Sequence, residues 1–121
     1  MAEHYSSFQQ GTWRWFLQRV TAVFLIGALA FHFILLHFIN HAASITFAGT
    51  EARMSGIIYF SLMWLFLVTA AFHGINGVYN ALVNMGLKGT KQKVVAGVLV
   101  LAGILLVIQG TRVAIAMSGM F

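Results

Sequence analysis

Residues 54–87 read MSGIIYFSLMWLFLVTAAFHGINGVYNALVNMGL, a run of 34 residues without a single Asp, Glu, Lys or Arg. Two further runs, one on each side of it, also lack all four charged residue types: residues 20–50 and residues 94–111. A helix needs about 20 mostly apolar residues to cross the hydrocarbon core of a bilayer. The three runs therefore predict an all-α membrane protein with spans at roughly 16–40, 56–82 and 94–117.

The composition of the chain supports the same fold class. Of its 121 residues 60% are hydrophobic and 7% are charged, whereas charged residues make up about 25% of an ordinary soluble domain. This balance excludes a soluble enzyme, a nucleic-acid-binding module and a disordered tail. The length predicts one membrane domain over residues 1–121. Because the chain has no cysteine, disulfides, thiolate catalysis and Cys-ligated metals are excluded.

The basic residues predict the orientation of the chain in the membrane. The loop between the first two spans carries only Arg53, offset by Glu51. The other side has more basic residues, before the first span and between the second and third: Arg14, Arg19, Lys88, Lys91 and Lys93. Positive charge favours the cytoplasmic side. We therefore expect the N-terminus inside and the C-terminus outside in a cytoplasmic (inner) membrane, with a first span too long for a signal peptide.

The third span contains only packing signals. Gly97, Gly103 and Gly110 are the small residues that let membrane helices approach each other closely. Three helices make a thin bundle, so we expect a partner subunit to complete it.

Histidines at membrane depth are the first candidates for a functional site. We set aside His4, in the N-terminal arm, and His41, at the outer end of the first span. His32 and His37 lie among apolar and aromatic residues with no nearby acid or cysteine. Zinc requires three or four convergent ligands, whereas haem iron takes one imidazole from each of two facing helices. The five-residue spacing turns the two side chains about 140° apart, so at most one ligates a given haem.

His73, in the second span, has more informative neighbours. Gly74 and Gly77 weaken a helix, and their presence indicates close approach by a flat group or by another helix. The structural alternative is a buried histidine that is merely hydrogen-bonded.

Polar residues near the inner ends of the spans are further candidates. Asn76, Asn80 and Asn84 form a stripe with a spacing of four residues, which is equally typical of polar contacts between helices. Arg19 begins the first uncharged run. It is either an interfacial anchor or a partner for a haem propionate or a quinone carbonyl.

Two motifs and the topology resemble a known family. The motifs are Gln18-Arg19-Val20-Thr21-Ala22, with His32 thirteen residues after Arg19, and Phe72-His73-Gly74-Ile75-Asn76-Gly77. With three spans and a cytoplasmic N-terminus, they resemble the small membrane-anchor subunits of succinate dehydrogenase and fumarate reductase (complex II). Within that family the chain is most similar to the type with two anchor subunits and two haems.

The resemblance implies a non-catalytic anchor that attaches the flavoprotein and iron–sulfur subunits to the membrane and carries electrons to quinone. It implies two b-type haems shared with a sister anchor subunit. His73 would ligate the inner haem and His32 the outer one, with His37 as the competing residue.

The chain departs from the family at the end of the second span, where an Asp-Tyr pair is replaced by Asn84-Met85. Tyr79 or Asn84 would then replace the usual quinone contact, or the sister subunit would carry it. Two alternatives remain from the sequence: a cytochrome b anchor of another respiratory complex, and a small transporter or channel element with a histidine proton relay.

Overall fold

The computed structural model describes residues 12–120, and within this range the chain forms helices and no strands. The helices are α1 (Thr12–Ile34, continued by a π-helical turn over Leu35–Ile39), α2 (Phe47–Met54), α3 (Ile57–Asn84) and α4 (Thr90–Ser118). Three segments are long and apolar enough to span a membrane: Trp13–Ile39, Ile57–Asn84 and Thr90–Ser118. The predicted all-α membrane fold with three spans is therefore confirmed.

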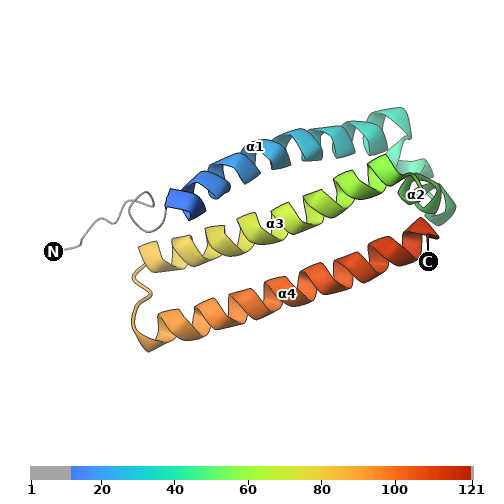
Figure 1. Ribbon diagram of the computed structural model, residues 1–121. Helices are drawn as coiled ribbons and strands as arrows, with labels where there is room; N and C mark the ends of the chain where they lie inside the picture. Colours follow the sequence, from blue (N-terminus) through green and yellow to red (C-terminus); the bar gives the residue numbers. More distant parts are fainter. Residues whose placement is uncertain (1–11, 121) are drawn as a thin grey trace.

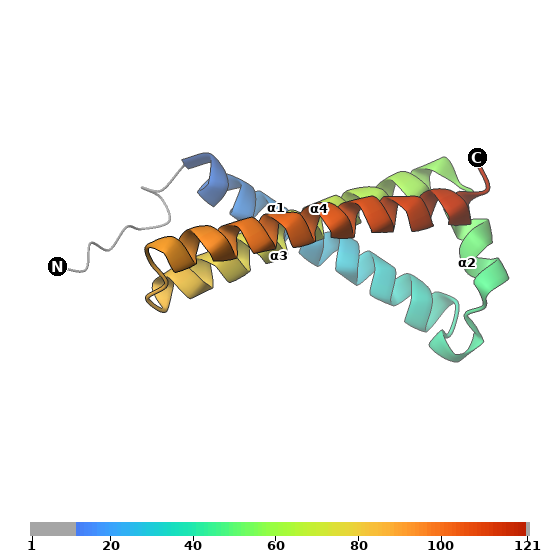
Figure 2. The same cartoon turned by 90° about the horizontal axis from the view of Figure 1, so that it is seen from below.

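The three long helices lie in a row, with α3 in the middle and α1 and α4 on either side of it (Figure 1). Seen from below, α1 crosses α3 obliquely while α4 runs nearly alongside it (Figure 2). Within the described part of the chain, no Cα atom of α1 comes within 8 Å of one in α4. The row leaves most side chains on its surface, and among residues 12–120 the only large hydrophobic side chain that is buried is that of Met54.

Glycines bring α3 and α4 together. A Cβ atom at Gly103 would collide with the Cδ1 atom of Ile75, and one at Gly110 would lie 2.5 Å from Cδ2 of Leu67. The predicted close approach is found between α3 and α4 at these two positions, whereas a Cβ at Gly97 would meet nothing within 4 Å inside the described part of this chain. Gly97 faces away from α3, since it precedes Gly103 by six residues, about 240° around the helix.

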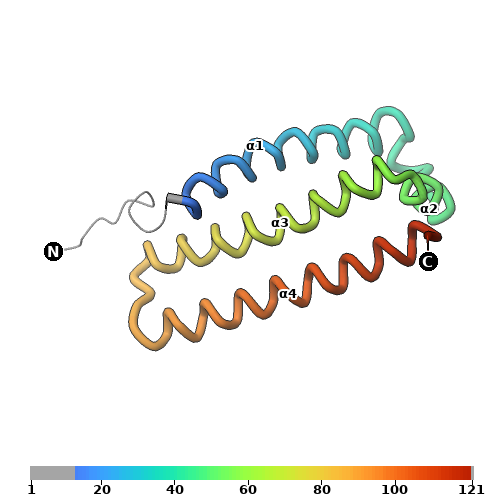
Figure 3. The backbone as a smooth tube through the Cα atoms, viewed as in Figure 1, coloured from blue at the N-terminus to red at the C-terminus, as the bar shows by residue number. Residues whose placement is uncertain are grey.

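A tight turn joins α3 to α4 at the end of the row that also holds the start of α1 (Figure 3). Gly86 and Gly89 adopt φ values of +102° and +69°, a region that residues with a Cβ rarely occupy. Lys88 lies in this turn and Lys91 and Lys93 in the first turn of α4, at the end of the row where α1 begins (Figure 3). Arg14 and Arg19 belong to the first turns of α1.

The sequence did not predict α2, which lies in the loop between the first two spans. The Thr46 side chain caps this helix by accepting a hydrogen bond from the Gly49 amide at 3.1 Å. The helix packs against α3 and α4 and buries Met54. Gly49 and Gly56 look like loop residues in the sequence, and eight residues are too few to show a clear hydrophobic period.

Candidate functional site

The residue at the centre of the site is His73, on the face of α3 that meets α1. Its Nδ1 atom lies 3.1 Å from the hydroxyl oxygen of Thr21 on α1. The Thr21 hydroxyl is also 2.6 Å from the carbonyl oxygen of Leu17, one turn earlier in the same helix. A second carbonyl oxygen, that of Gln18, lies 3.1 Å from it, so the single hydroxyl proton has an acceptor on α1 itself.

This arrangement suits the tautomer of His73 that carries its proton on Nδ1. In that tautomer the Thr21 hydroxyl donates to Leu17 and its oxygen accepts a hydrogen bond from Nδ1–H of the imidazole. The neutral ring then carries its lone pair on Nε2. A histidine held through Nδ1 with a free Nε2 lone pair is prepared to ligate a metal.

Three more side chains tie α1 to α3 beside this pair. Asn76 is buried, and its Oδ1 atom accepts hydrogen bonds from Nη2 and Nε of Arg14 at 2.8 and 3.2 Å. Its amide nitrogen donates to Oε1 of Gln18 at 2.7 Å, and Gln18 in turn donates to the carbonyl oxygen of His73 at 3.3 Å. Every polar atom of Asn76 is thus paired, and the network fixes α1 against α3 next to the imidazole.

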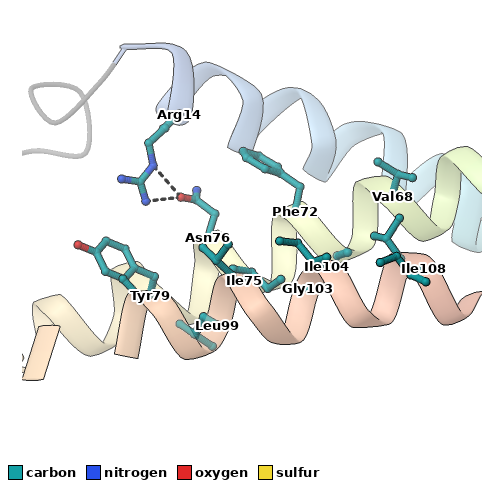
Figure 4. A pocket seen from close by; sticks show the side chains of 14 residues that line it. Arg14, Val68, Phe72, Ile75, Asn76, Tyr79, Leu99, Gly103, Ile104 and Ile108 are labelled. Carbon is teal, nitrogen blue, oxygen red and sulfur yellow. Dashed lines mark hydrogen bonds between the residues drawn. The ribbon is translucent and has the colours of Figure 1, made fainter. Parts of the chain in front are cut away.

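Arg14 also closes one end of an apolar groove that runs along α3 and α4 (Figure 4). The groove has a volume of about 660 Å³. At its polar end the Arg14 guanidinium lies 5.2 Å from the centre of the Tyr79 ring, and the Tyr79 hydroxyl accepts a hydrogen bond from Gln92 at 2.8 Å.

Two predicted quinone contacts, Arg19 and Asn84, line a different and smaller pocket between α1 and α3. It has a volume of about 220 Å³ and is more polar than the groove, with Asn80 and Gln18 also in its wall. The Arg19 guanidinium lies 5.6 Å from the centre of the Trp15 ring. Arg14 and Arg19 thus both lie at this pocket, and Tyr79 lies on the other side of α3.

The other predicted ligands lie farther along α1. His32 is half-buried against α3, with its ring stacked on Phe66 at a centroid distance of 6.4 Å, and its buried Nδ1 atom has no hydrogen-bond partner within residues 12–120. His37 is exposed and lies in the π-helical turn, where it stacks on Phe33 and its Nδ1 atom is 3.2 Å from the Phe33 carbonyl oxygen.

The depths of these histidines differ. His73 lies level with Thr21, and His32 follows Thr21 by eleven residues, about 16 Å along α1. The two imidazoles therefore cannot ligate the same iron. His41 is exposed in the loop between the first two membrane-spanning helices, and His4 lies outside the described residues.

The sequence prediction did not include Arg14 as a site residue and assigned no contact to Gln18 or Thr21. A signal for them exists, because Arg14, Gln18 and Thr21 are spaced four and three residues apart and so share one face of α1. Which face of α3 they meet depends on the packing of the two helices.

The fold and the site together define a multi-pass helical membrane protein with a histidine and a polar network between two of its membrane helices. The succinate dehydrogenase/fumarate reductase transmembrane subunit family matches residues 2–111. The chain belongs to this family and is a membrane-anchor subunit of succinate dehydrogenase or fumarate reductase. No curated protein and no solved structure matched the chain.

Proposed function

We propose that this chain is a haem-b-binding anchor of a succinate:quinone oxidoreductase. It attaches the flavoprotein and iron–sulfur subunits to the inner face of the membrane, where its basic residues gather, and it carries electrons toward quinone. The observation that carries this proposal is the contact between His73 and Thr21, which prepares an imidazole at membrane depth with its Nε2 lone pair free.

The chemistry of His73 fits a b-type haem. Its imidazole lies within a membrane span and is oriented through Nδ1 by the Thr21 side chain, which leaves Nε2 for iron. Bound there, haem supplies one-electron transfer between the iron–sulfur subunit and quinone. Since the described histidines of this chain lie at different depths, the second axial ligand of each haem comes from the sister anchor subunit.

His32 is our candidate for the outer haem. Its buried Nδ1 atom has no partner within residues 12–120, which costs free energy unless a further group satisfies it. His37 competes for this role because its Nδ1 atom is 3.2 Å from a carbonyl oxygen, which leaves Nε2 as the nitrogen for a metal.

The small polar pocket is the candidate quinone contact on this chain. Arg19 and Asn84 lie in its wall and offer hydrogen-bond donors to a quinone carbonyl. Tyr79 lies on the other side of α3, with its hydroxyl engaged by Gln92, so it contacts a different surface from Arg19.

Purification of the chain from its native membrane tests the proposed function. We expect the flavoprotein, iron–sulfur and sister anchor subunits to co-elute, and the preparation to show a b-type reduced-minus-oxidised spectrum. A channel or transporter element would give neither result. The same spectrum together with a different set of partners would instead indicate the anchor of another respiratory complex.

Replacing Thr21 with valine tests the role of its hydroxyl. Loss of the acceptor for Nδ1–H makes the His73 imidazole less basic and weakens its preference for ferric iron. A tenfold loss of that preference raises the one-electron midpoint potential of the inner haem by about 60 mV. Thr21→Ser keeps the hydroxyl and should keep the potential. An unchanged potential in Thr21→Val, measured by redox titration of the purified complex, contradicts the assignment.

Substitutions at Arg19 test the quinone contact. Lysine keeps the positive charge but loses the planar fork of donors, and glutamine loses both. We expect quinone reduction to fall from wild type to Arg19→Lys to Arg19→Gln, by about tenfold or more for glutamine. Succinate oxidation with a soluble dye should not change, because that chemistry lies in the partner subunits. Arg112→Gln, at the other end of the row, is the matched control. Equal quinone reduction in all variants would make Arg19 an interfacial anchor.

A further inference from the structure

The apolar groove between α3 and α4 takes no part in the proposed haem contacts, and the only residue that it shares with the small polar pocket proposed for quinone is Arg14. Its walls are apolar side chains from both helices, and on α4 they extend from Ala96 to Ile108, about 18 Å along the helix axis. One leaflet of the hydrocarbon core is about 15 Å deep. The groove thus runs from the membrane surface to about the depth that one acyl chain reaches.

One end of the groove is polar and cationic. Arg14 donates hydrogen bonds from Nε and Nη2 to Oδ1 of Asn76 (Figure 4). Its other N–H groups remain for a ligand at the mouth of the groove. The Tyr79 ring and hydroxyl lie beside it. An occupant that fits this groove has a long apolar chain and a polar or anionic group at one end.

The charge around the mouth indicates an anionic group. Five basic residues lie at this end of the row, at the starts of α1 and α4 and in the turn between α3 and α4: Arg14, Arg19, Lys88, Lys91 and Lys93. The only acid within residues 12–120 is Glu51, which lies in α2 at the opposite end. No carboxylate in the described part of the chain therefore neutralises Arg14.

We propose that this groove binds an anionic phospholipid, with one acyl chain between α3 and α4 and the phosphate on Arg14. Basic pockets between membrane helices on the cytoplasmic side recognise acidic headgroups in this way. The site is independent of the haem ligands, since His73 faces α1 and the groove lies between α3 and α4.

Native mass spectrometry of the purified four-subunit complex tests the proposal. The complex is stripped with detergent and then exposed to micelles that contain phosphatidylglycerol or phosphatidylcholine. We expect one phosphatidylglycerol to be retained in preference to phosphatidylcholine. Arg14→Gln should reduce that preference about fivefold, and Lys88→Gln, at the same end but outside the groove, should reduce it less.

A second pair of variants fills the groove without touching the network at Asn76. Val100 lines the groove and is 54% exposed, so Val100→Phe adds bulk where the acyl chain would lie. Val98, 60% exposed on the same helix, does not line it, and Val98→Phe is the matched control. We expect lipid retention to be lost only in Val100→Phe. Equal retention of the two lipids by the wild type, or equal retention by both phenylalanine variants, overturns the proposal.

A photo-crosslinking amino acid at position 100 separates the lipid from a helix of the sister subunit. A mass increase equal to one phospholipid on this chain supports the proposal. A crosslinked product that contains the sister subunit shows that a protein helix occupies the groove and overturns it.

Discussion

Replacing His73 with alanine in the assembled complex is expected to remove one b-type haem. The imidazole is the only described histidine at its depth, and its Nδ1 contact with Thr21 suits the tautomer that leaves Nε2 to bind iron. Without this ligand the iron loses one of its two axial bonds. The haem content of the purified complex, measured by its reduced-minus-oxidised spectrum, should fall by one haem per complex.

A control and a rescue separate ligation from a general loss of structure. His41→Asn, in the exposed outer loop, should leave the haem content unchanged. Haem and imidazole added together to the His73→Ala complex should restore a low-spin haem spectrum, because imidazole can fill the space left by the side chain and supply the missing axial ligand. A full complement of haem in His73→Ala would remove this residue from the ligand set.

The second large effect concerns the outer haem. We expect His32→Ala to abolish its signal, because this ring is held between α1 and α3 by Phe66 and has an unsatisfied Nδ1 atom. His37→Ala should retain the signal, since His37 is exposed in the π-helical turn, whereas His32 is half-buried against α3. The inner haem should keep its spectrum in both variants, which serves as an internal reference.

The comparison of these two variants identifies the residue of this chain that ligates the outer haem. Loss of the outer signal in His37→Ala alone assigns the ligand to His37. Retention of the outer signal in both variants shows that neither His32 nor His37 is needed to ligate the outer haem. In either case our assignment of His32 would be wrong, while the role of His73 would stand.

The number and the approximate limits of the spans could be predicted from the sequence. A membrane span requires a long uncharged run, and Arg19, Glu51, Arg53, Lys88 and Lys93 mark where such runs stop. The short helix α2 could not be found in this way. It depends on the Thr46 cap and on contacts of Met54 with the long helices, and neither gives a periodic signal over eight residues.

The sequence singles out several residues of the candidate site, but it does not predict which residues contact one another. His73 and Asn76 stand out in the sequence because polar groups at membrane depth are costly. Their partners Thr21 and Gln18 lie more than fifty residues away on α1, and the oblique crossing of the two helices selects them. Gly97 and Gly103 look equivalent in the sequence, and only the packing of α4 on α3 distinguishes them.

The row arrangement of the three long helices also bears on how substitutions combine. The contact of Thr21 with His73 lies in the interface between α1 and α3, and that of Gly110 with Leu67 lies in the interface between α3 and α4. These are two separate interfaces, because α1 and α4 both pack on α3 and not on each other. Free-energy changes at sites that are far apart and share no partner usually add within about 0.3–0.5 kcal/mol. The effects of substitutions in the two interfaces on the free energy of unfolding should therefore be additive. Substitutions at Arg14, Gln18 and Asn76, which share one hydrogen-bond network, should instead show strong coupling.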